Sequence, residues 1–453
     1  MIKRSRPKPE GSVTAKSPSV AIIGGGIAGM SAAFFLARSG IETTIYEAAD
    51  TLGGACSSIS LDGRTVDAFY HVLTLNGPLR EIADAIDLRP LLRRVATTTG
   101  YFVGGVLHPL TSIREIASFK ALTVGQRIML AVCVLRALAT RDGNSLDDVR
   151  AEDWLCRIGG QGAYERFWLP MMRAKFGTQL RRIVATDMWF RIRRFAETAF
   201  LAKGGGCYTP RGSLAVFIDR LADALAGMGA TIVTGAPVQA IAPRDGGGFQ
   251  LALPNGREAV HDIVISTLPL PLFARIVPGG HDDYRLRLSA IEYLNNACLI
   301  LKTTRPISEN YQLAFADDDV PFTAIIGAHH LYPADEQGGF ITYFSRYCAA
   351  DDAAITMTAD ELLASYLPYI SKIRPDFACD EVLAKYHSRG IAIEPLHTIG
   401  YGRRIPGFRT PWPGLWCLSA ANIYPEPTVI DTSAHYAKRL VDEVLRSEQG
   451  TRA

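Results

Sequence analysis

An ordered strand, glycine-rich turn, helix and second strand between residues 18 and 47 constrain this chain more than any other feature. The first strand is the apolar run 20–23. The turn has the spacing Gly-x-Gly-x-x-Gly over 24–29, and the second strand, 43–46, is followed by the carboxylate Glu47. A turn of this spacing alone is weak evidence, because any glycine-rich loop can match it. With a strand before it and a helix after it, the turn predicts a dinucleotide-binding βαβ unit.

The residues of the turn each suit a phosphate site. Gly24 permits the tight turn, Gly26 lets a pyrophosphate approach the backbone, and Gly29 allows close packing of helix on strand. Ile27 and Ala28 open the helix, whose N-terminal N–H groups and partial positive charge attract phosphate. The turn therefore predicts that these residues hold a dinucleotide.

Glu47 indicates which dinucleotide the site takes. It lies 18 residues beyond Gly29, where an acidic side chain accepts hydrogen bonds from a ribose hydroxyl. A carboxylate at this position repels a 2′-phosphate, which argues against NADP at this site.

After Glu47 the chain resembles the FAD-dependent amine oxidase superfamily, which includes phytoene desaturases, protoporphyrinogen oxidases and monoamine oxidases. The resemblance starts at Gly53, Gly54 and Ala55, which follow Leu52. In that family a Leu-Gly-Gly segment wraps around the cofactor, because adjacent glycines let the main chain lie close to a bulky planar ligand. The chain departs from the family at Ala55, where Arg is common. The resemblance implies FAD as the cofactor.

The resemblance extends over nearly the whole chain. Segment 230–241 resembles the strand whose valine, here Val238, lays its backbone against the adenine. Segment 414–422 resembles the last strand of the FAD domain, although the family often has Gly-Asp or Gly-Glu before the final helix where this chain has Ala-Asn. That helix would begin near Asp431 and direct its N-terminus at the flavin pyrimidine. The resemblance thus implies that Val238, Asn422 and Asp431 contact FAD.

The order of these segments predicts an α/β fold with two interleaved domains. A discontinuous Rossmann-type FAD-binding domain would comprise residues 18–95, 204–275 and 395–445, an α+β substrate-binding domain 96–203 and 276–394, and a disordered basic tail 1–17. In the first insertion we expect a helix capped near Ser145 and ending at Gly159, then a second from about Gln161 to Trp168 ending at Pro170. In the second we expect strands at 296–302, 322–328 and 339–345 and a helix at 359–373.

Composition excludes several classes of protein. The net charge of +3 over 453 residues is too small to imply nucleic-acid binding. The eight cysteines form no Cys-x-x-Cys pair, no spacing predicts a metal site, and a reducing cytoplasm is the expected location. The longest unbroken apolar run near the middle of the chain, 128–135, is far shorter than the roughly 20 residues that span a bilayer. A peripheral membrane contact and the oligomeric state stay open.

Two short segments are candidates for the chemistry. In the family, the segment that ends with Tyr70 and His71 passes beside the isoalloxazine ring, so either side chain could touch substrate or flavin. The alternative is a core tyrosine and a hydrogen-bonded structural histidine. Arg173 and Lys175, just before Gly177, could bind an anionic group or poise the flavin. The alternative is a helix C-terminus whose cations complement the helix dipole.

The resulting prediction is an FAD-dependent oxidase or desaturase that removes a hydride from a C–H bond of a small organic metabolite. An alternative is a redox-neutral sugar-nucleotide mutase of the UDP-galactopyranose mutase type. Its diphosphate substrate would need converging arginines, for which Arg173, Arg346 and Arg403 are candidates. A flavin-containing scaffold without turnover is a third class. The substrate and the electron acceptor stay open.

Overall fold

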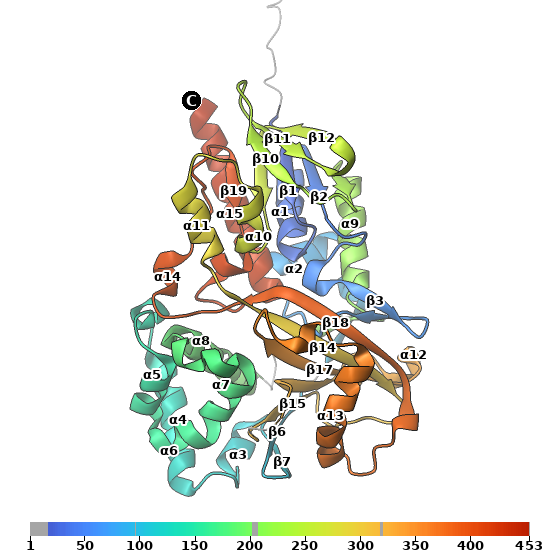
Figure 1. The fold of residues 1–453 in the computed structure, drawn as a ribbon, viewed down its shortest axis with the longest axis vertical. Coiled ribbons are helices and arrows are strands. Elements are labelled where there is room, and N and C mark those ends of the chain that lie inside the picture. The colour runs from blue at the N-terminus through green and yellow to red at the C-terminus, as the bar shows by residue number, and fades with distance from the viewer. Residues whose placement is uncertain (1–16, 96, 202–206, 318–319, 453) are drawn as a thin grey trace, which may run out of the picture.

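The computed structural model describes residues 17–95, 97–201, 207–317 and 320–452, which build two large sheets and their covering helices (Figure 1). The predicted tail, apart from residue 17, and the start of the 204–275 segment, residues 204–206, lie outside this range. The two sheets lie one after the other along the long axis of the molecule, with the parallel sheet above the other one in Figure 1.

The first sheet is parallel and contains the strands of the predicted βαβ unit. Its strands, in spatial order, are β19 (Leu415–Cys417), β13 (Ile263–Ser266), β1 (Val20–Ile23), β2 (Thr43–Tyr46) and β9 (Thr231–Val233). Ile22 of β1 lies between Ile45 of β2 and Ile265 of β13. Val20 and Ile22 face one hydrophobic cluster and Ala21 and Ile23 face another, so both faces are buried. This explains why the strands are apolar without alternation.

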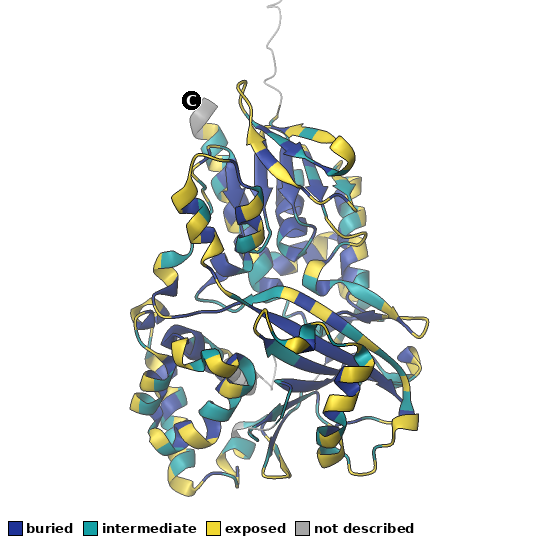
Figure 2. Cartoon of the chain, viewed as in Figure 1, coloured by how far each residue is buried: buried dark blue, intermediate teal, exposed yellow. Residues whose placement is uncertain are grey.

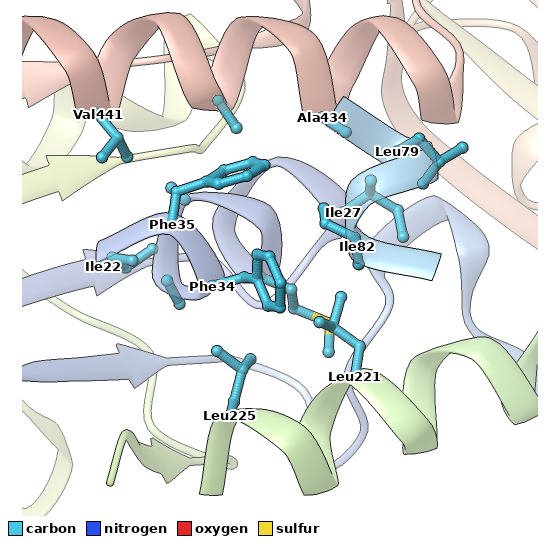
Figure 3. Packing of buried hydrophobic residues seen from close by; sticks show 14 of the residues in the cluster. Ile22, Ile27, Phe34, Phe35, Leu79, Ile82, Leu221, Leu225, Ala434 and Val441 are labelled. Atoms are coloured by element: carbon cyan, nitrogen blue, oxygen red, sulfur yellow. The ribbon is translucent and has the colours of Figure 1, made fainter. Parts of the chain in front are cut away.

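Helices cover one face of the parallel sheet. They are α1 (Ile27–Arg38), α2 (Gly77–Ala85), α9 (Ala215–Gly227) and α15 (Ile430–Arg452). Phe34 of α1 points toward Leu221 and Leu225 of α9, and Phe35 lies beside Val441 of α15 (Figure 3). The opposite face packs on the antiparallel strands β10 (Ala240–Pro243), β11 (Phe249–Ala252) and β12 (Glu258–His261) and on α10 (Leu270–Ile276) and α11 (Asp282–Ser289). Helix α1 is thereby fixed with its N-terminus at the glycine turn.

The second sheet has seven strands. In spatial order they are β18 (Val382–Pro395), β14 (Tyr293–Thr303), β17 (Phe340–Cys348), β16 (Ala324–Gly327), β15 (Gln312–Phe315), β6 (Thr99–Val103) and β7 (Val106–Pro109). Strands β6 and β7 come from the first predicted insertion and the other five from the second, and they meet where β6 pairs in parallel with β15. Helix α13 (Ala359–Ile373) packs its apolar side, including Tyr366, on this sheet.

A group of helices lies beside the second sheet, with buried inner faces and exposed outer ones (Figures 1 and 2). These helices are α3 (Ile113–Ala117), α4 (Val124–Ala139), α5 (Ala151–Gly159), α6 (Gln161–Ala163), α7 (Leu169–Phe176) and α8 (Ala185–Leu201). Smaller elements are the hairpin β3 (Ser58–Leu61) with β4 (Arg64–Asp67), the pair β5 (Leu92–Val95) with β8 (Cys207–Pro210), and the short helices α12 (Ala334–Gln337) and α14 (Tyr401–Arg404).

Several predicted elements are confirmed. Helix α13 has the predicted bounds, and β14 contains the predicted strand 296–302 with extra residues at both ends. The predicted strand 339–345 begins one residue too early and ends three too early, since β17 covers Phe340–Cys348. The predicted strand 322–328 is shorter, because β16 covers only Ala324–Gly327. Helix α5 ends at Gly159 as predicted, and Gly160 follows with φ 78°.

Two predicted helix boundaries are wrong. Ser145 caps no α-helix. It lies in a short 3₁₀ turn whose N-cap is Asp142, and α5 begins only at Ala151. The helix predicted to end at Pro170 continues through it, since α6 runs into a π-helical turn at Tyr164–Trp168 and then into α7. Proline clashes with the carbonyl four residues earlier in a regular helix, and the wider π turn offers that carbonyl another position.

Candidate active site

The glycine turn after β1 contains two glycines that the protein itself requires. Gly24 has φ 109°, and a Cβ added there would lie 2.5 Å from Thr267 Oγ1. A Cβ on Gly29 would lie 2.0 Å from the backbone oxygen of Gly24, which is an impossible contact. These positions admit only glycine because the turn is tight and α1 lies close to β1, as the sequence predicted.

Gly26 differs from both, because the space that a Cβ atom would occupy there is open. It is the N-cap of α1, with φ −75°, and a Cβ there would meet nothing nearer than Gly54 Cα at 3.9 Å. Among the described residues, no side chain forms a capping hydrogen bond at the N-terminus of α1. The structure therefore leaves space in front of the helix N-terminus, where phosphate oxygens would find N–H groups and a favourable dipole.

A second glycine loop faces the first one. Gly53 donates its N–H to the backbone oxygen of Gly25 at 2.9 Å, and Gly26 and Gly53 form a parallel β-bridge. A Cβ on Gly54 would lie 3.3 Å from Gly26 Cα, and Ala55 follows in the same single 3₁₀ turn. The two loops form a cradle of backbone atoms, which fits a bulky dinucleotide.

Glu47 lies at the end of β2, beside this cradle. Its Oε2 accepts the N–H of Gly25 at 2.6 Å and its Oε1 accepts the N–H of Ala49 at 2.8 Å. The carboxylate thus fixes the glycine turn through a contact that the sequence did not reveal. Its predicted bond to a ribose stays a prediction.

The other predicted cofactor contacts lie on loops around the cradle. Val238 is buried between β9 and β10. Asn422 donates Nδ2 to the oxygen of Pro406 at 2.7 Å and accepts the N–H of Ser419 at 2.7 Å. The oxygen and the nitrogen of the Asn422 side-chain amide therefore both fix the turn that follows β19. Its contact to FAD, like that of Val238, stays a prediction.

Asp431 joins the N-terminus of α15 to the loop before α2. Its two oxygens accept the N–H groups of Thr74, at 3.1 Å, and Asn76, at 2.8 Å. The structure thus gives this carboxylate a role in holding two elements of the cradle together, and its contact to FAD stays a prediction.

Lys175 belongs to a partly buried ion-pair cluster. Its Nζ lies 2.7 Å from Glu394 Oε1 and 4.2 Å from the centre of the Tyr347 ring, and its side chain is 15% exposed. Arg191 of α8 donates to the same Glu394 oxygen at 2.8 Å. Burial and the neighbouring Arg191 lower the pKa of Lys175, and Glu394 opposes that shift. Lys175 thus lies in the last turn of α7 before Gly177, as the alternative predicted, and its ammonium is a partly buried cation beside an aromatic ring.

Two further members complete this cluster. Asp187 lies 2.6 Å from Arg191 Nε, and its other oxygen lies 2.8 Å from His397 Nδ1. Burial alone would raise the pKa of Glu394, but Lys175 and Arg191 outweigh it and lower that pKa to about 2. Burial likewise opposes ionisation of Asp187, yet Arg191 and His397 hold its pKa well below the usual range. The cluster was missed from the sequence, because its members are spread over 223 residues without a local motif.

Tyr70 and His71 lie under the second sheet. The Tyr70 ring is 6.0 Å from that of Tyr343, and burial raises the pKa of Tyr70 to about 12. His71 Nδ1 lies 3.0 Å from the oxygen of Phe69, and burial lowers the pKa of His71. Both observations fit the structural alternative, and contact of either residue with substrate or flavin stays a prediction.

Asp67, a buried carboxylate, begins the same candidate segment, and no role of its own was predicted for it from the sequence. It accepts the N–H of Leu214, at the start of α9, at 2.8 Å and the hydroxyl of Tyr332 at 2.5 Å. Burial raises its pKa to about 6 against these hydrogen bonds. Asp67 therefore connects β4 of the hairpin to the start of α9 and to the loop between β16 and β17.

A cavity of about 310 Å³ opens between α7 and β17. Its charged lining residues are Arg173, Lys175, Arg346, Asp317 and Asp352. Arg346 is paired with Asp352 at 2.8 Å, and Asp317 accepts the N–H of Gly104 at 2.9 Å. Arg403 is not among the lining residues, and pairs on the surface with Asp148. Two of the three arginines proposed for a diphosphate thus reach one cavity, and the third does not.

A sequence profile of the flavin containing amine oxidoreductases matches residues 27–411. The chain belongs to this family. Its cofactor is FAD, and the backbone cradle at the N-terminus of α1 fits that group. The chain is an FAD-dependent oxidoreductase, an oxidase or desaturase, that acts on a C–H bond of a small organic substrate, as the sequence predicted.

Among the proteins similar to this chain are enzymes named for carotenoids and their precursors. The chain is 24% identical over 443 residues to a carotenoid phi-ring synthase of Streptomyces griseus. The matched region covers 89% of this chain and 82% of that protein. The chain is 22% identical over 293 residues to a phytoene dehydrogenase of the same organism, over 58% of this chain and 57% of that protein. A crystal structure of reduced UDP-galactopyranose mutase has a TM-score of 0.73 at 18% identity, covering 95% of this chain and 96% of the mutase. At that identity the likeness shows the shared fold alone. In the described residues, no helix combines the length and apolarity needed to cross a membrane.

Proposed function

We propose that this oxidoreductase dehydrogenates an apolar, isoprenoid-like substrate and forms a C=C bond. The observation that carries the proposal is that two of the three cations lining the cavity between α7 and β17 are already paired with carboxylates. Arg346 there is paired with Asp352, and Lys175 with Glu394. A diphosphate-bearing substrate would need an excess of positive charge, whereas a hydrocarbon needs none.

The apolar lining supports the same substrate class. Phe176, Leu294, Phe315 and Val320 line the same cavity. Two of the relatives are named for phytoene and for a carotenoid ring, which are isoprenoid compounds. This support favours the desaturase over the sugar-nucleotide mutase.

The chain's own residues divide the work between the two sheets. The parallel-sheet domain (18–95, 204–275 and 395–445) would hold FAD at the cradle formed by Gly26, Gly53 and Gly54, with Glu47 fixing the turn. Bound FAD supplies the acceptor for a hydride from the substrate carbon. The other domain (96–203 and 276–394) would cover the substrate and exclude water.

Lys175 and Arg173 would form one wall of the substrate site, and Tyr70 and His71 would lie near the flavin. The Lys175 ammonium is held over Tyr347 by Glu394, so it presents a fixed positive charge at Nζ. We propose a cytoplasmic location with a peripheral membrane contact, since an apolar substrate is concentrated in bilayers.

Anaerobic titration of the holoenzyme with a detergent-solubilised linear polyene tests the proposal. We expect stoichiometric bleaching of the oxidised flavin and a product with one further double bond. Conversion of a sugar nucleotide only after dithionite reduction would replace the proposal with the mutase. If no polyene bleaches the flavin and no sugar nucleotide is converted, the result would favour the scaffold without turnover.

A further inference from the structure

Helix α4 exposes an apolar face to solvent. Val124, Ile128 and Leu135 are 63%, 58% and 63% exposed, and Ala131 is also exposed. Their spacing of four, three and four residues places all four on one side of an α-helix. We call these four residues the outward face of α4.

The other side of the same helix is apolar as well. Leu130, Cys133 and Ala137 are buried and pack into the core of the helical group. A surface helix ordinarily carries polar residues opposite its buried side. Between Val124 and Ala139 the only charged residues are Arg127 and Arg136. The outward face of α4 is therefore not explained by the fold of the chain.

Positive charges border the outward face. On a helical projection Arg127 and Arg136 lie on its two flanks, and each donates to a backbone oxygen, of Ala117 and Ile158 respectively. Within the described residues neither arginine forms an ion pair with a carboxylate. The segment from residue 112 to 141 contains five basic residues and one acidic residue. The surface is therefore both apolar and basic.

We propose that the outward face of α4 docks on a membrane surface that contains anionic lipid. An apolar helix face with cations along its edges is the pattern that lies in the headgroup region, with the apolar side toward the acyl chains. At 16 residues α4 is about 24 Å long, too short to cross the roughly 30 Å hydrocarbon core, so it would lie along the surface. The surface is inferred from α4 alone, whereas its use, access to an apolar substrate, rests on the function proposed above.

A second copy of the chain is the competing occupant. In a two-fold contact through α4 the basic flanks of one copy would approach those of the other, and like charges repel. Anionic headgroups match the same flanks with opposite charge. The charge pattern therefore favours the membrane.

The test is co-sedimentation of the full-length holoenzyme with vesicles of phosphatidylcholine, with and without phosphatidylglycerol. We expect binding that increases with phosphatidylglycerol and weakens at high salt, which shortens the Debye length from about 10 Å at 0.1 M to about 3 Å at 1 M. The double variant Ile128→Glu with Leu135→Glu should partition at least about tenfold less, because it removes apolar contact and adds negative charge.

A matched control carries the same chemical change elsewhere. Leu286→Glu with Val260→Glu alters two side chains that are 67% and 50% exposed on α11 and β12, and it should bind vesicles like the wild type. All variants should keep their flavin and thermal midpoint, since the altered side chains are exposed. Equal binding by the α4 variant and the wild type, or no vesicle binding by either, would overturn the proposal. The proposal would also be overturned if the wild type were a dimer without lipid and the α4 double variant were a monomer under the same conditions. Flavin bleaching by polyene in detergent tests the substrate separately.

Discussion

The proposed cofactor cradle is built from backbone atoms, whereas the proposed substrate side is held by side-chain charges. The cradle consists of backbone atoms around Gly26, Gly53 and Gly54, fixed by one carboxylate. The proposed substrate side contains the partly buried charges of Lys175 and Glu394 and their neighbours. A backbone cradle depends on residues close in sequence, whereas a charge cluster depends on residues that only the fold brings together. The two should therefore respond differently to mutation and to pH.

The largest expected effect separates two glycines of one turn. Gly29→Ala places a Cβ 2.0 Å from the oxygen of Gly24, so the backbone must move, at a cost near the upper end of overpacking penalties, about 3 kcal/mol. Gly26→Ala meets nothing nearer than 3.9 Å, so the apoprotein should stay within about 0.5 kcal/mol of wild type. Its FAD occupancy should nevertheless fall, because the added methyl group fills the phosphate position. Denaturant unfolding of apoprotein and flavin absorbance after dialysis measure the two effects.

Gly246→Ala is the control, since a Cβ there has no neighbour within 4 Å and its φ is ordinary. It should change neither stability nor flavin content. Full FAD occupancy in Gly26→Ala would show that the phosphates lie elsewhere, and the cradle would then be only a tight turn.

In the cluster around Lys175, Glu394→Gln should destabilise the protein by about 3 kcal/mol, because the partly buried Lys175 loses its carboxylate and Arg191 keeps only Asp187. The exposed pair of Glu292 with Arg182 provides the control: Glu292→Gln should cost at most about 1 kcal/mol, as surface ion pairs do. Equal unfolding free energies for the two variants would mean that the cluster is as solvated as a surface pair.

The same cluster predicts an acid transition. The pKa of Glu394 is lowered to about 2 in the folded protein, below its unfolded value, so its contribution is complete above the unfolded pKa. That contribution is lost as pH falls from about 4.5 toward 2. Thermal midpoints measured across this range should fall more steeply for wild type than for Glu394→Gln. Parallel curves would contradict the linkage.

A smaller effect is expected from Glu47→Ala, which should weaken FAD binding by about 1–3 kcal/mol. Its oxygens hold the N–H groups of Gly25 and Ala49, so part of the loss would come from a looser turn and part from the ribose. Isothermal titration of apoprotein with FAD, beside apoprotein unfolding, separates the two parts. The exposed Glu42, four residues before the end of β2, serves as control through Glu42→Ala. Unchanged FAD affinity in Glu47→Ala would exclude the ribose contact.

The difference between backbone sites and side-chain clusters also explains which parts of the structure could be predicted from the sequence. The βαβ unit, the strands 296–302 and 339–345 and helix α13 follow local apolar patterns, and the structure confirms them apart from the bounds of 339–345. The sequence did not predict that the helix continues through Pro170. A proline is a strong local signal for a helix end, and the π turn that precedes it has no comparable signal in the sequence. The ion pairs of Lys175 were missed for another reason, since Glu394 is 219 residues away and reaches it only through the pairing of β18 with β14. Local rules predict backbone sites, and long-range side-chain clusters need the fold.

The smallest expected effect is the one that tests whether the charge cluster serves the chemistry. Lys175→Met keeps the aliphatic stem beside Tyr347 and removes the charge held by Glu394. Arg191 still pairs with Glu394 in this variant, so the fold and the flavin should survive. Flavin reduction by substrate, followed anaerobically in a stopped-flow instrument, should slow by at least about tenfold, or about 1.4 kcal/mol. The control Lys385→Met alters a more exposed lysine that pairs with Asp360, and its reduction rate should match wild type. A wild-type rate in Lys175→Met would leave the partly buried cluster a purely structural feature and place the chemistry nearer Tyr70 and His71.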